Sequence, residues 1–314
     1  MLETEQVLRE ALGCAWLIAG PTASGKSQLA MAMAQRLDGE IISVDSMQVY
    51  RGMDIGTAKP TRADQQQVRH HLIDVAELQD SFDAAAFRRL AVAAILDIHK
   101  RSKTILLCGG TGFYFQALLQ GVGKGPSGNQ ELRKQFQQWD LEALKDRLRQ
   151  QDPLAYQRVD LNNRRKVIRA LEVIELTGLP FSQSQSDWSM PLPLDPRKCW
   201  VFDMPSSVLN ERIELRVERM LEEGWMEETR MLMKDGLEEA PTASQAIGYG
   251  QIMDHLRGKI DHKEMKEWIK IRTRQLAKRQ RTWFRHQLEA KSLPMESSPD
   301  FMVETMVRQA SSSG

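Results

Sequence analysis

The chain has 314 residues, and 41% of them are hydrophobic, which is enough for the core of one large or two ordinary domains. Because 43 Lys and Arg nearly balance 42 Asp and Glu, the overall charge does not indicate a polyanionic partner. Cys14, Cys108 and Cys199 lack the paired spacing of a zinc site, and we expect buried thiols in a reducing compartment. The amino terminus lacks a basic start followed by an apolar core, and no run is long enough to span a membrane. We therefore expect a cytoplasmic protein with no membrane partner.

The first motif along the chain is a glycine-rich loop between a strand predicted over 16–19 and a helix predicted over 28–37. It has the pattern Gly-x-x-x-x-Gly-Lys-Ser and consists of Gly20, Pro21, Thr22, Ala23, Ser24, Gly25, Lys26 and Ser27. In such a loop, backbone N–H groups and the start of the helix together bind phosphate. Lys26 would place its charge on the phosphate oxygens, and the Ser27 hydroxyl would hold Mg²⁺. The loop predicts a di- or triphosphate site, without indicating which.

Two further apolar runs deliver polar residues to one edge of the predicted sheet. A strand over 40–45 ends at Asp45, and a strand over 103–108 is followed by the turn Gly109–Gly112, which contains Thr111. The helix predicted over 81–100 separates these strands, so the order strand, helix, strand indicates a parallel α/β sheet. Parallel strands bring their carboxyl ends to the same edge, so Asp45 and Thr111 are expected beside the phosphate loop. Thr111 alone could equally be a helix cap.

The adjacent histidines His70 and His71 invite a metal-binding interpretation. Neighbouring side chains of a strand point to opposite faces, so the two rings cannot easily bind one ion. We assign no metal to them.

The second half of the chain changes character. We predict an inserted helical subdomain over 123–163, a catalytic core formed by 14–122 and 164–290, and a flexible tail over 291–314. A helix over 164–175 is expected to re-enter the core, and its cation-rich start opposes the helix dipole unless an anion binds there. A strand over 199–202 is predicted as the last of the sheet.

Two later helices carry basic residues. The helix predicted over 209–221 contains Arg212, Arg216 and Arg219, and at least one of them should face the sheet edge. The segment 263–286 has nine Lys or Arg against two Glu, interleaved with aromatic residues. This pattern suits a nucleic-acid backbone, although a solvated or membrane-surface amphipathic helix is the alternative.

Seven motifs in order along the chain resemble one family. They are 20–27, 43–50 (Ser-Val-Asp-Ser-Met-Gln-Val-Tyr), 52–60, 109–114 (Gly-Gly-Thr-Gly-Phe-Tyr), 169–173 (Arg-Ala-Leu-Glu-Val), 246–249 and 277–285 (Ala-Lys-Arg-Gln-Arg-Thr-Trp-Phe-Arg). Together they resemble the bacterial tRNA dimethylallyltransferases of the tRNA isopentenyltransferase family. The fold implied is a P-loop NTPase-like parallel sheet flanked by helices, with an inserted helical subdomain.

The resemblance implies an activity and a set of partners. It implies transfer of a dimethylallyl group from dimethylallyl diphosphate to N6 of the adenosine 3′-adjacent to the anticodon, with Mg²⁺, by an enzyme that we expect to be a monomer. The adenine amino group is a poor nucleophile, so a base that accepts its proton is useful, and Asp45 is the candidate. Lys26, the loop amides, Mg²⁺ and Arg216 would stabilise the leaving diphosphate. Thr111 would also contact the reacting region.

The resemblance also implies contacts with the tRNA anticodon stem-loop. The residues concerned are Asp45, Ser46, Met47, Gln48, Thr111, Arg133, Arg165, Lys166, Val167, Ile168, Arg169, Gln245, Ala246, Ile247, Gly248, Tyr249 and Gly250. The sequence departs from the family pattern at Lys166, where Arg is common, and at Gly250, where a longer polar or basic residue is common.

Three alternatives use the same motifs. A small-molecule or nucleoside kinase would share the loop and the acid, but the chain has no obvious Arg-rich lid and its basic segments would have no purpose. An isopentenyltransferase acting on free adenine nucleotide would share the chemistry without needing long basic segments. A non-catalytic RNA-binding module would leave Asp45 beside the phosphate loop without a role.

Overall fold

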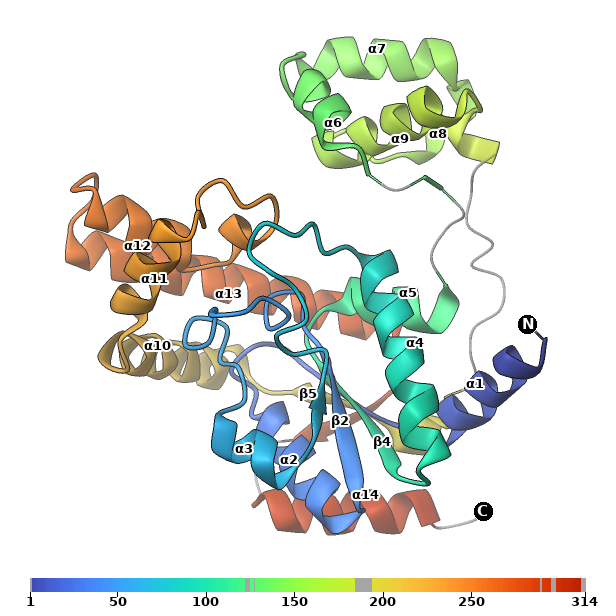
Figure 1. The fold of residues 1–314 in the computed structure, drawn as a ribbon, viewed down its shortest axis with the longest axis vertical. Helices are drawn as coiled ribbons and strands as arrows, with labels where there is room; N and C mark the ends of the chain where they lie inside the picture. Colours follow the sequence, from blue (N-terminus) through green and yellow to red (C-terminus); the bar gives the residue numbers. More distant parts are fainter. Residues whose placement is uncertain are drawn as a thin grey trace. The chain divides into compact units, whose positions relative to one another are not determined.

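The computed structural model describes residues 2–121, 125–126, 128–183, 194–288, 290–294 and 298–311. The chain divides into two compact units, one formed by Met1–Leu119 with Leu192–Gly314 and the other by Gln120–Pro191. The predicted α/β class with an inserted helical part is confirmed (Figure 1).

The first unit is built on a six-stranded parallel sheet with the strand order β3-β2-β4-β1-β5-β6. Its strands are β1 (Trp16–Ala19), β2 (Gly39–Val44), β3 (His70–His71), β4 (Thr104–Gly109), β5 (Cys199–Asp203) and β6 (Lys291–Pro294). Its helices are α1 (Leu2–Cys14), α2 (Lys26–Arg36), α3 (Arg62–Gln67), α4 (Ala84–Lys100), α5 (Gly112–Gln120), α10 (Ser206–Glu222), α11 (Trp225–Lys234), α12 (Tyr249–Leu256), α13 (His262–Gln287) and α14 (Pro299–Ser311), with short 3-10 turns at Pro196–Lys198 and Ala243–Gln245. Of the described helices, none has the length and apolar character to cross a membrane.

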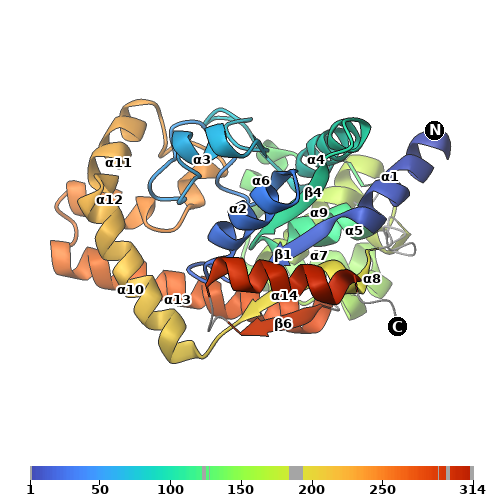
Figure 2. The same cartoon turned by 90° about the horizontal axis from the view of Figure 1, so that it is seen from below.

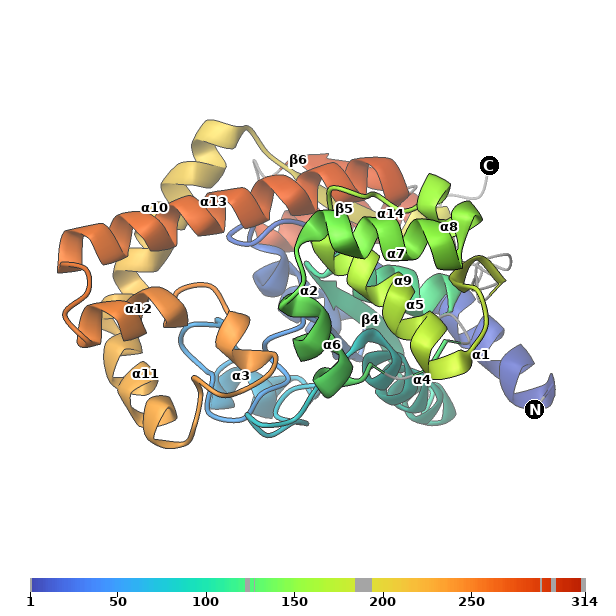
Figure 3. The same cartoon turned by 90° about the horizontal axis from the view of Figure 1, so that it is seen from above.

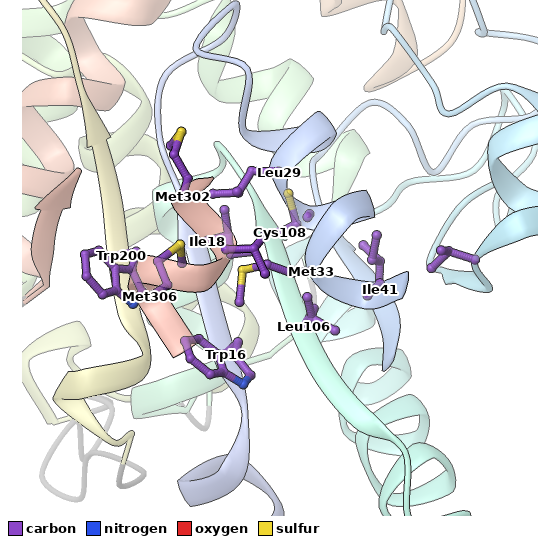
Figure 4. Close-up of a cluster of buried hydrophobic side chains, with 14 of the residues drawn as sticks. Trp16, Ile18, Leu29, Met33, Ile41, Leu106, Cys108, Trp200, Met302 and Met306 are labelled. Carbon is purple, nitrogen blue, oxygen red and sulfur yellow. The ribbon is translucent and has the colours of Figure 1, made fainter. Parts of the chain in front are cut away.

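Different helices cover the two faces of the sheet, and the strand register shows which side chains share a face. Ile18 lies opposite Cys108 on one neighbouring strand and Trp200 on the other. These three side chains share a face because alternate residues of a strand point the same way, and they pack under α2 and α14. Figure 4 shows Met306 of α14 beside Trp200 and Met302 beside Leu29 of α2, with Met33 in the same cluster. On the other side, α1 and α4 pack on β4 and on each other.

The end of the chain differs from the expected flexible tail. β6 pairs in parallel with β5, and α14 packs against α2 with Met302, Val303 and Met306 buried (Figure 2). β5 is therefore not the last strand of the sheet, because the edge that it would have exposed is covered by β6.

The second unit contains α6 (Gln130–Gln137), α7 (Leu141–Gln151), α8 (Pro153–Arg158), α9 (Arg164–Thr177) and a 3-10 turn at Phe181–Gln183. Its own core includes Phe136, Leu144 and Leu171. α9 was expected to re-enter the sheet-containing core, but its apolar stripe packs against α6 and α7. The helical unit thus extends beyond the predicted end at 163, whereas the predicted boundary at 122–123 lies outside the described residues.

Two smaller expectations concern single residues. Cys108 and Cys199 are buried as expected, but Cys14 at the end of α1 is exposed. His70 bonds through Nδ1 with the carbonyl oxygen of Val68, while Nε2 of His71 lies 2.7 Å from Glu40. The two rings thus have separate partners.

Glu40 forms a buried ionic cluster near the start of β2. The side chain of Glu40 is only 8% exposed. Its carboxylate accepts hydrogen bonds from Nη1 and Nη2 of Arg101, the second of them at 2.8 Å, and also lies against the ring of His71. These hydrogen bonds, led by that from Arg101, lower the pKa of Glu40 from 4.5 to about 2. Because the pKa is lowered in the folded state, ionised Glu40 stabilises the protein above pH 4.5, and this stability is lost as the pH falls toward 2.

Replacing Glu40 by Gln should lower the free energy of unfolding by about 2 kcal/mol near neutral pH, because Arg101 and His71 lose their charged partner. The difference from wild type should shrink steadily below pH 4.5. Urea unfolding of both proteins across this pH range measures it. A constant difference down to about pH 3 would show that the ionisation of Glu40 contributes nothing.

Candidate active site

The phosphate loop runs from β1 to α2 with a backbone shaped for an anion. Ala23 and Gly25 both have positive φ, at 62° and 88°. The amide of Ser24 donates to the Pro21 carbonyl, whereas those of Gly25, Lys26 and Ser27 have no acceptor among the described residues. Left-handed residues alternating with ordinary ones turn successive N–H groups to one side, which produces an anion-binding concavity. The predicted loop therefore has the backbone that its sequence pattern implies.

Three cations lie beside this loop: Arg212 of α10 donates through Nη1 to the Ser24 carbonyl at 3.4 Å, and Lys26 and Arg216 line the cavity. Lys26 Nζ donates to the Pro21 carbonyl at 3.1 Å, and Arg216 of α10 makes no hydrogen bond or ion pair within the described residues. Burial lowers the pKa of Lys26, and Arg216 contributes to that shift. Burial also lowers the pKa of Arg216, while the Asp45 carboxylate opposes the change. Two desolvated cations side by side are unfavourable until an anion joins them, so this site is prepared for negative charge.

Asp45 lies just past the end of β2, as predicted, within a tight turn. Its Oδ1 accepts from the amides of Met47 and Gln48 at 2.8 and 3.3 Å. Its Oδ2 has no hydrogen-bond partner in the described part of the chain. One oxygen thus fixes the carboxylate, and the other remains available to a ligand.

Thr111 joins the turn after β4 to the turn after β2. Its Oγ1 accepts from the Ser46 amide at 3.1 Å, and its own amide donates to the Val44 carbonyl at 3.2 Å. The hydroxyl of Thr111 therefore holds the Asp45 turn, and its proton is left to be donated to a bound molecule.

These groups line one cavity of about 480 Å³ within the first unit. Of the predicted site residues, the following line it: Thr22, Lys26, Ser27, Asp45, Ser46, Met47, Gln48, Thr111, Arg216, Gln245, Ala246 and Ile247. The remaining residues of the phosphate loop do not line the cavity; they are Gly20, Pro21, Ala23, Ser24 and Gly25. The carboxyl ends of the strands and the crossing helix α13 bound this region (Figures 1 and 3).

The cavity residues fit Mg²⁺ in a particular way. The hydroxyl of Ser27, the predicted ligand, lines the cavity. Among the described residues, no group of three or more His, Cys, Asp or Glu forms a cage for a metal. Mg²⁺ commonly takes one or two protein ligands and completes its shell with substrate phosphates and water, which this sparse donor set allows.

Several predicted RNA-binding residues have side chains that pack or hydrogen-bond within the protein. Val167 and Ile168 are buried in the core of the second unit, and Tyr249 is buried and donates to Glu228 at 2.7 Å. Ala246 and Gly248 are buried too, while Gly250 is partly exposed. The side chains of Val167, Ile168 and Tyr249 thus have almost no surface for RNA, whereas Ala246 lines the cavity. The side-chain carboxamide of Gln48 also makes its hydrogen bonds within the protein: its oxygen accepts from the Ser43 hydroxyl, and its nitrogen donates to the Thr57 and Ala58 carbonyls.

The basic residues of α9 and α6 have internal partners in the second unit. Arg133 and Arg169 both bind the buried carboxylate of Glu172, at 2.8 and 2.6 Å. Arg165 and Lys166 are exposed. Glu172 therefore offsets part of the positive charge that made the start of α9 unfavourable in isolation.

The basic segment predicted over 263–286 forms α13, but about half of its cations are paired. Three cations form ion pairs with acids of α10: Lys266 and Lys270 bind Glu218, and Arg274 binds Glu214. A fourth, Arg281, binds Asp203 at the end of β5. The exposed cations that remain are Lys263, Arg272, Lys278, Arg279 and Arg285. Part of the basic pattern thus reflects packing between helices.

The sequence interpretation missed two features of the cavity. Arg279 and Gln280 of α13 line it, and their only sequence signal was membership of the motif at 277–285. Glu228 of α11 accepts from the amides of Asp54, Ile55 and Gly56, which fixes the loop that forms another wall. One of two adjacent acids in the first turn of an amphipathic helix gives no sequence signal for such a role.

The parallel sheet, the loop between β1 and α2, and the acid after β2 define an α/β protein of the P-loop class with an anion site at the sheet edge. Residues 48–287 match the family model described as IPP transferase. The chain belongs to the IPP transferase family.

Relatives and solved structures agree with this assignment. The chain is 46% identical to a tRNA dimethylallyltransferase 1 of Trichlorobacter lovleyi, over 86% of this chain and 90% of that one. It is 43% identical to a tRNA dimethylallyltransferase of Geobacter metallireducens, over 87% and 90%. The crystal structure of a tRNA isopentenylpyrophosphate transferase from Bacillus halodurans superposes with a TM-score of 0.68 at 36% identity, covering 94% and 95%. A eukaryotic dimethylallyltransferase acting on tRNA gives 0.75 at 26% identity, covering 89% and 73%.

Replacing Lys26 by Ala should weaken the binding of inorganic diphosphate by about 10- to 100-fold, because a charge-assisted contact is lost in a desolvated site. Titration calorimetry measures the affinity. Lys100→Ala is the control: it removes the same charge at the end of α4, near the amino end of β4, and should leave the affinity for diphosphate unchanged. Equal losses in the two variants would mean that only overall charge matters.

Proposed function

We propose that the protein transfers a dimethylallyl group from dimethylallyl diphosphate to N6 of the adenosine 3′-adjacent to the anticodon of tRNA, with Mg²⁺. The observation that supports this most strongly is the single cavity shared by Lys26, Ser27, Arg216 and Asp45. It puts an anion site and a free carboxylate oxygen next to each other. The names of the relatives supply the acceptor and the prenyl donor. Because all four residues belong to one compact unit, a monomer has the complete set.

The proposed reaction is a substitution at the first carbon of the prenyl chain. The N6 lone pair forms a C–N bond to this carbon, and the bond from carbon to the diphosphate oxygen breaks, with its electron pair going to the diphosphate. Asp45 Oδ2 accepts the N6 proton, which offsets the weak nucleophilicity of the amino group.

The same residues stabilise the leaving group. The unbonded amides of Gly25, Lys26 and Ser27, with the side chains of Lys26 and Arg216, stabilise the charge that develops on the diphosphate. Ser27 would hold Mg²⁺, which neutralises further charge on the diphosphate oxygens when bound. The adenosine must leave its stack to reach the cavity, as in other enzymes that modify a base.

A direct assay tests the assignment. Radiolabelled dimethylallyl diphosphate is incubated with the enzyme and Mg²⁺, and with either tRNA or AMP as acceptor. Label should enter tRNA and be lost when the adenosine beside the anticodon is replaced. Label in AMP alone would indicate a free-nucleotide transferase, and phosphate transfer from ATP to a small acceptor would indicate a kinase.

Replacing Asp45 by Asn should lower kcat by about 10²- to 10⁴-fold while diphosphate affinity stays nearly constant, because Asn keeps the Oδ1 acceptor and removes the base. Single-turnover kinetics and calorimetry with a thio-analogue of the diphosphate measure the two quantities. Asp64→Asn is the matched control, since Asp64 also lines the cavity but its Oδ2 is engaged by Thr61 at the start of α3.

Two outcomes would contradict this role for Asp45. A loss of Mg²⁺-dependent affinity together with rate would make Asp45 a metal ligand. A kcat near that of wild type would leave it a structural residue.

Replacing Arg165 and Lys166, the exposed cations at the start of α9, by Ala should raise KM for tRNA more than KM for dimethylallyl diphosphate, since these cations are proposed to bind RNA phosphate. The slope of log affinity for tRNA against log salt should fall by about 1.5, as two fewer counterions are released. Arg149→Ala, which removes an exposed cation from α7, is the control. An equal rise in both KM values would instead connect these two cations with the prenyl donor.

A further inference from the structure

Gln280 of α13 connects two segments that are distant in the sequence. Its Oε1 accepts from the amide of Thr22 in the phosphate loop at 2.9 Å. Its Nε2 donates to the carbonyl of Gly110, in the turn between β4 and α5, at 3.0 Å. Only one orientation of the carboxamide satisfies both bonds, because the oxygen can only accept and the nitrogen can only donate.

The turn between β4 and α5 is shaped to let α13 approach. A Cβ on Gly110 would lie 2.5 Å from Gln280 Nε2 and 3.2 Å from the Gly20 carbonyl oxygen. A Cβ on Gly112 would lie 2.2 Å from the indole ring of Trp283, which is on the same helix. The glycines of this motif thus make room for α13, and Gly109 in turn accepts from the Gly20 amide at 3.3 Å.

Gln280 contributes to a division of the phosphate loop into two parts. In the first part, the amides of Thr22 and Ser24 have acceptors within the protein, namely Gln280 and Pro21, while the Ala23 amide between them has none among the described residues. In the second part, the amides of Gly25, Lys26 and Ser27 have none among the described residues. A side chain that holds the first part fixes the direction in which the second part presents its N–H groups.

We infer that Gln280 is a positioning residue for the diphosphate: it fastens the phosphate loop to the turn after β4, so that the loop is already in its binding conformation before the prenyl donor arrives. This inference rests on the diphosphate site of the proposed function but not on the identity of the acceptor. Preorganisation of this kind raises affinity because less conformational entropy is lost on binding.

The test uses the full-length enzyme with inorganic diphosphate and Mg²⁺ as the binding probe. Gln280→Ala removes both hydrogen bonds and should weaken diphosphate binding about tenfold. It should raise KM for dimethylallyl diphosphate similarly, with a smaller change in KM for tRNA. Gln280→Asn keeps both polar groups on a shorter side chain and should recover part of the affinity. Gln275→Ala, an exposed glutamine on the same helix, is the matched control and should behave as wild type.

A double-mutant cycle with Gly110→Ala tests the contact itself. The new methyl group should displace the Gln280 carboxamide, so Gly110→Ala should also weaken diphosphate binding. The loss in the double variant should be smaller than the sum of the two single losses, because both disturb one contact. If the two losses were additive, the inference that Gln280 positions the phosphate loop through its contact with Gly110 would be overturned.

Melting temperatures separate positioning from general stability. If Gln280→Ala lowers the melting temperature but leaves diphosphate affinity and KM at wild-type values, Gln280 is only a structural residue and the inference fails. If wild type binds inorganic diphosphate but labels no tRNA, the proposed function fails while the effect of Gln280 on diphosphate binding is still measured.

Discussion

The structure depends on keeping three backbone N–H groups, those of Gly25, Lys26 and Ser27, without acceptors from the chain. The free-energy cost of a donor without an acceptor grows with its burial; Gly25 and Lys26 are partly buried and Ser27 is exposed, and the loop that presents these groups is held by other contacts. Here β1 and α2 fix the two ends of the loop. Gln280 of α13 accepts from its Thr22 amide and donates to the turn after β4, which holds the loop in place. The desolvated charges of Lys26 and Arg216 add to the same local cost. An arriving diphosphate relieves all of these at once.

Carboxylates play two different parts in this protein. Asp45 keeps one oxygen available at the cavity, and the role proposed for it depends on that availability. Glu172, Glu228 and Glu40 are instead fully engaged by arginines or backbone amides. They hold a basic helix start, a cavity wall and a strand start in place. The contrast shows why composition alone cannot separate reactive acids from structural ones.

The predictable parts of the fold were those with strong local patterns. The strands that became β1, β2 and β4 and the helices that became α2 and α4 were predicted because buried parallel strands are continuous apolar runs and amphipathic helices repeat every three to four residues. β6 and α14 were missed because a short polar edge strand and a helix in a polar tail lack such patterns until they pack on β5 and α2. The position of α9 was predicted incorrectly because an apolar stripe shows that a helix is half buried, but not against which partner.

The sequence by itself determined the phosphate loop, the placement of Asp45 and Thr111 at the sheet edge, and the likeness to a family, because each depends on residues close together in the chain. Only the tertiary structure decided that Gln280 holds that loop across 258 positions, that Glu228 fixes the opposite wall, and that acids of α10 pair with three of the nine cations of the basic segment in α13. These contacts join residues whose separation along the chain carries no periodic signal. Their geometry arises only when the sheet brings several loop ends to one edge.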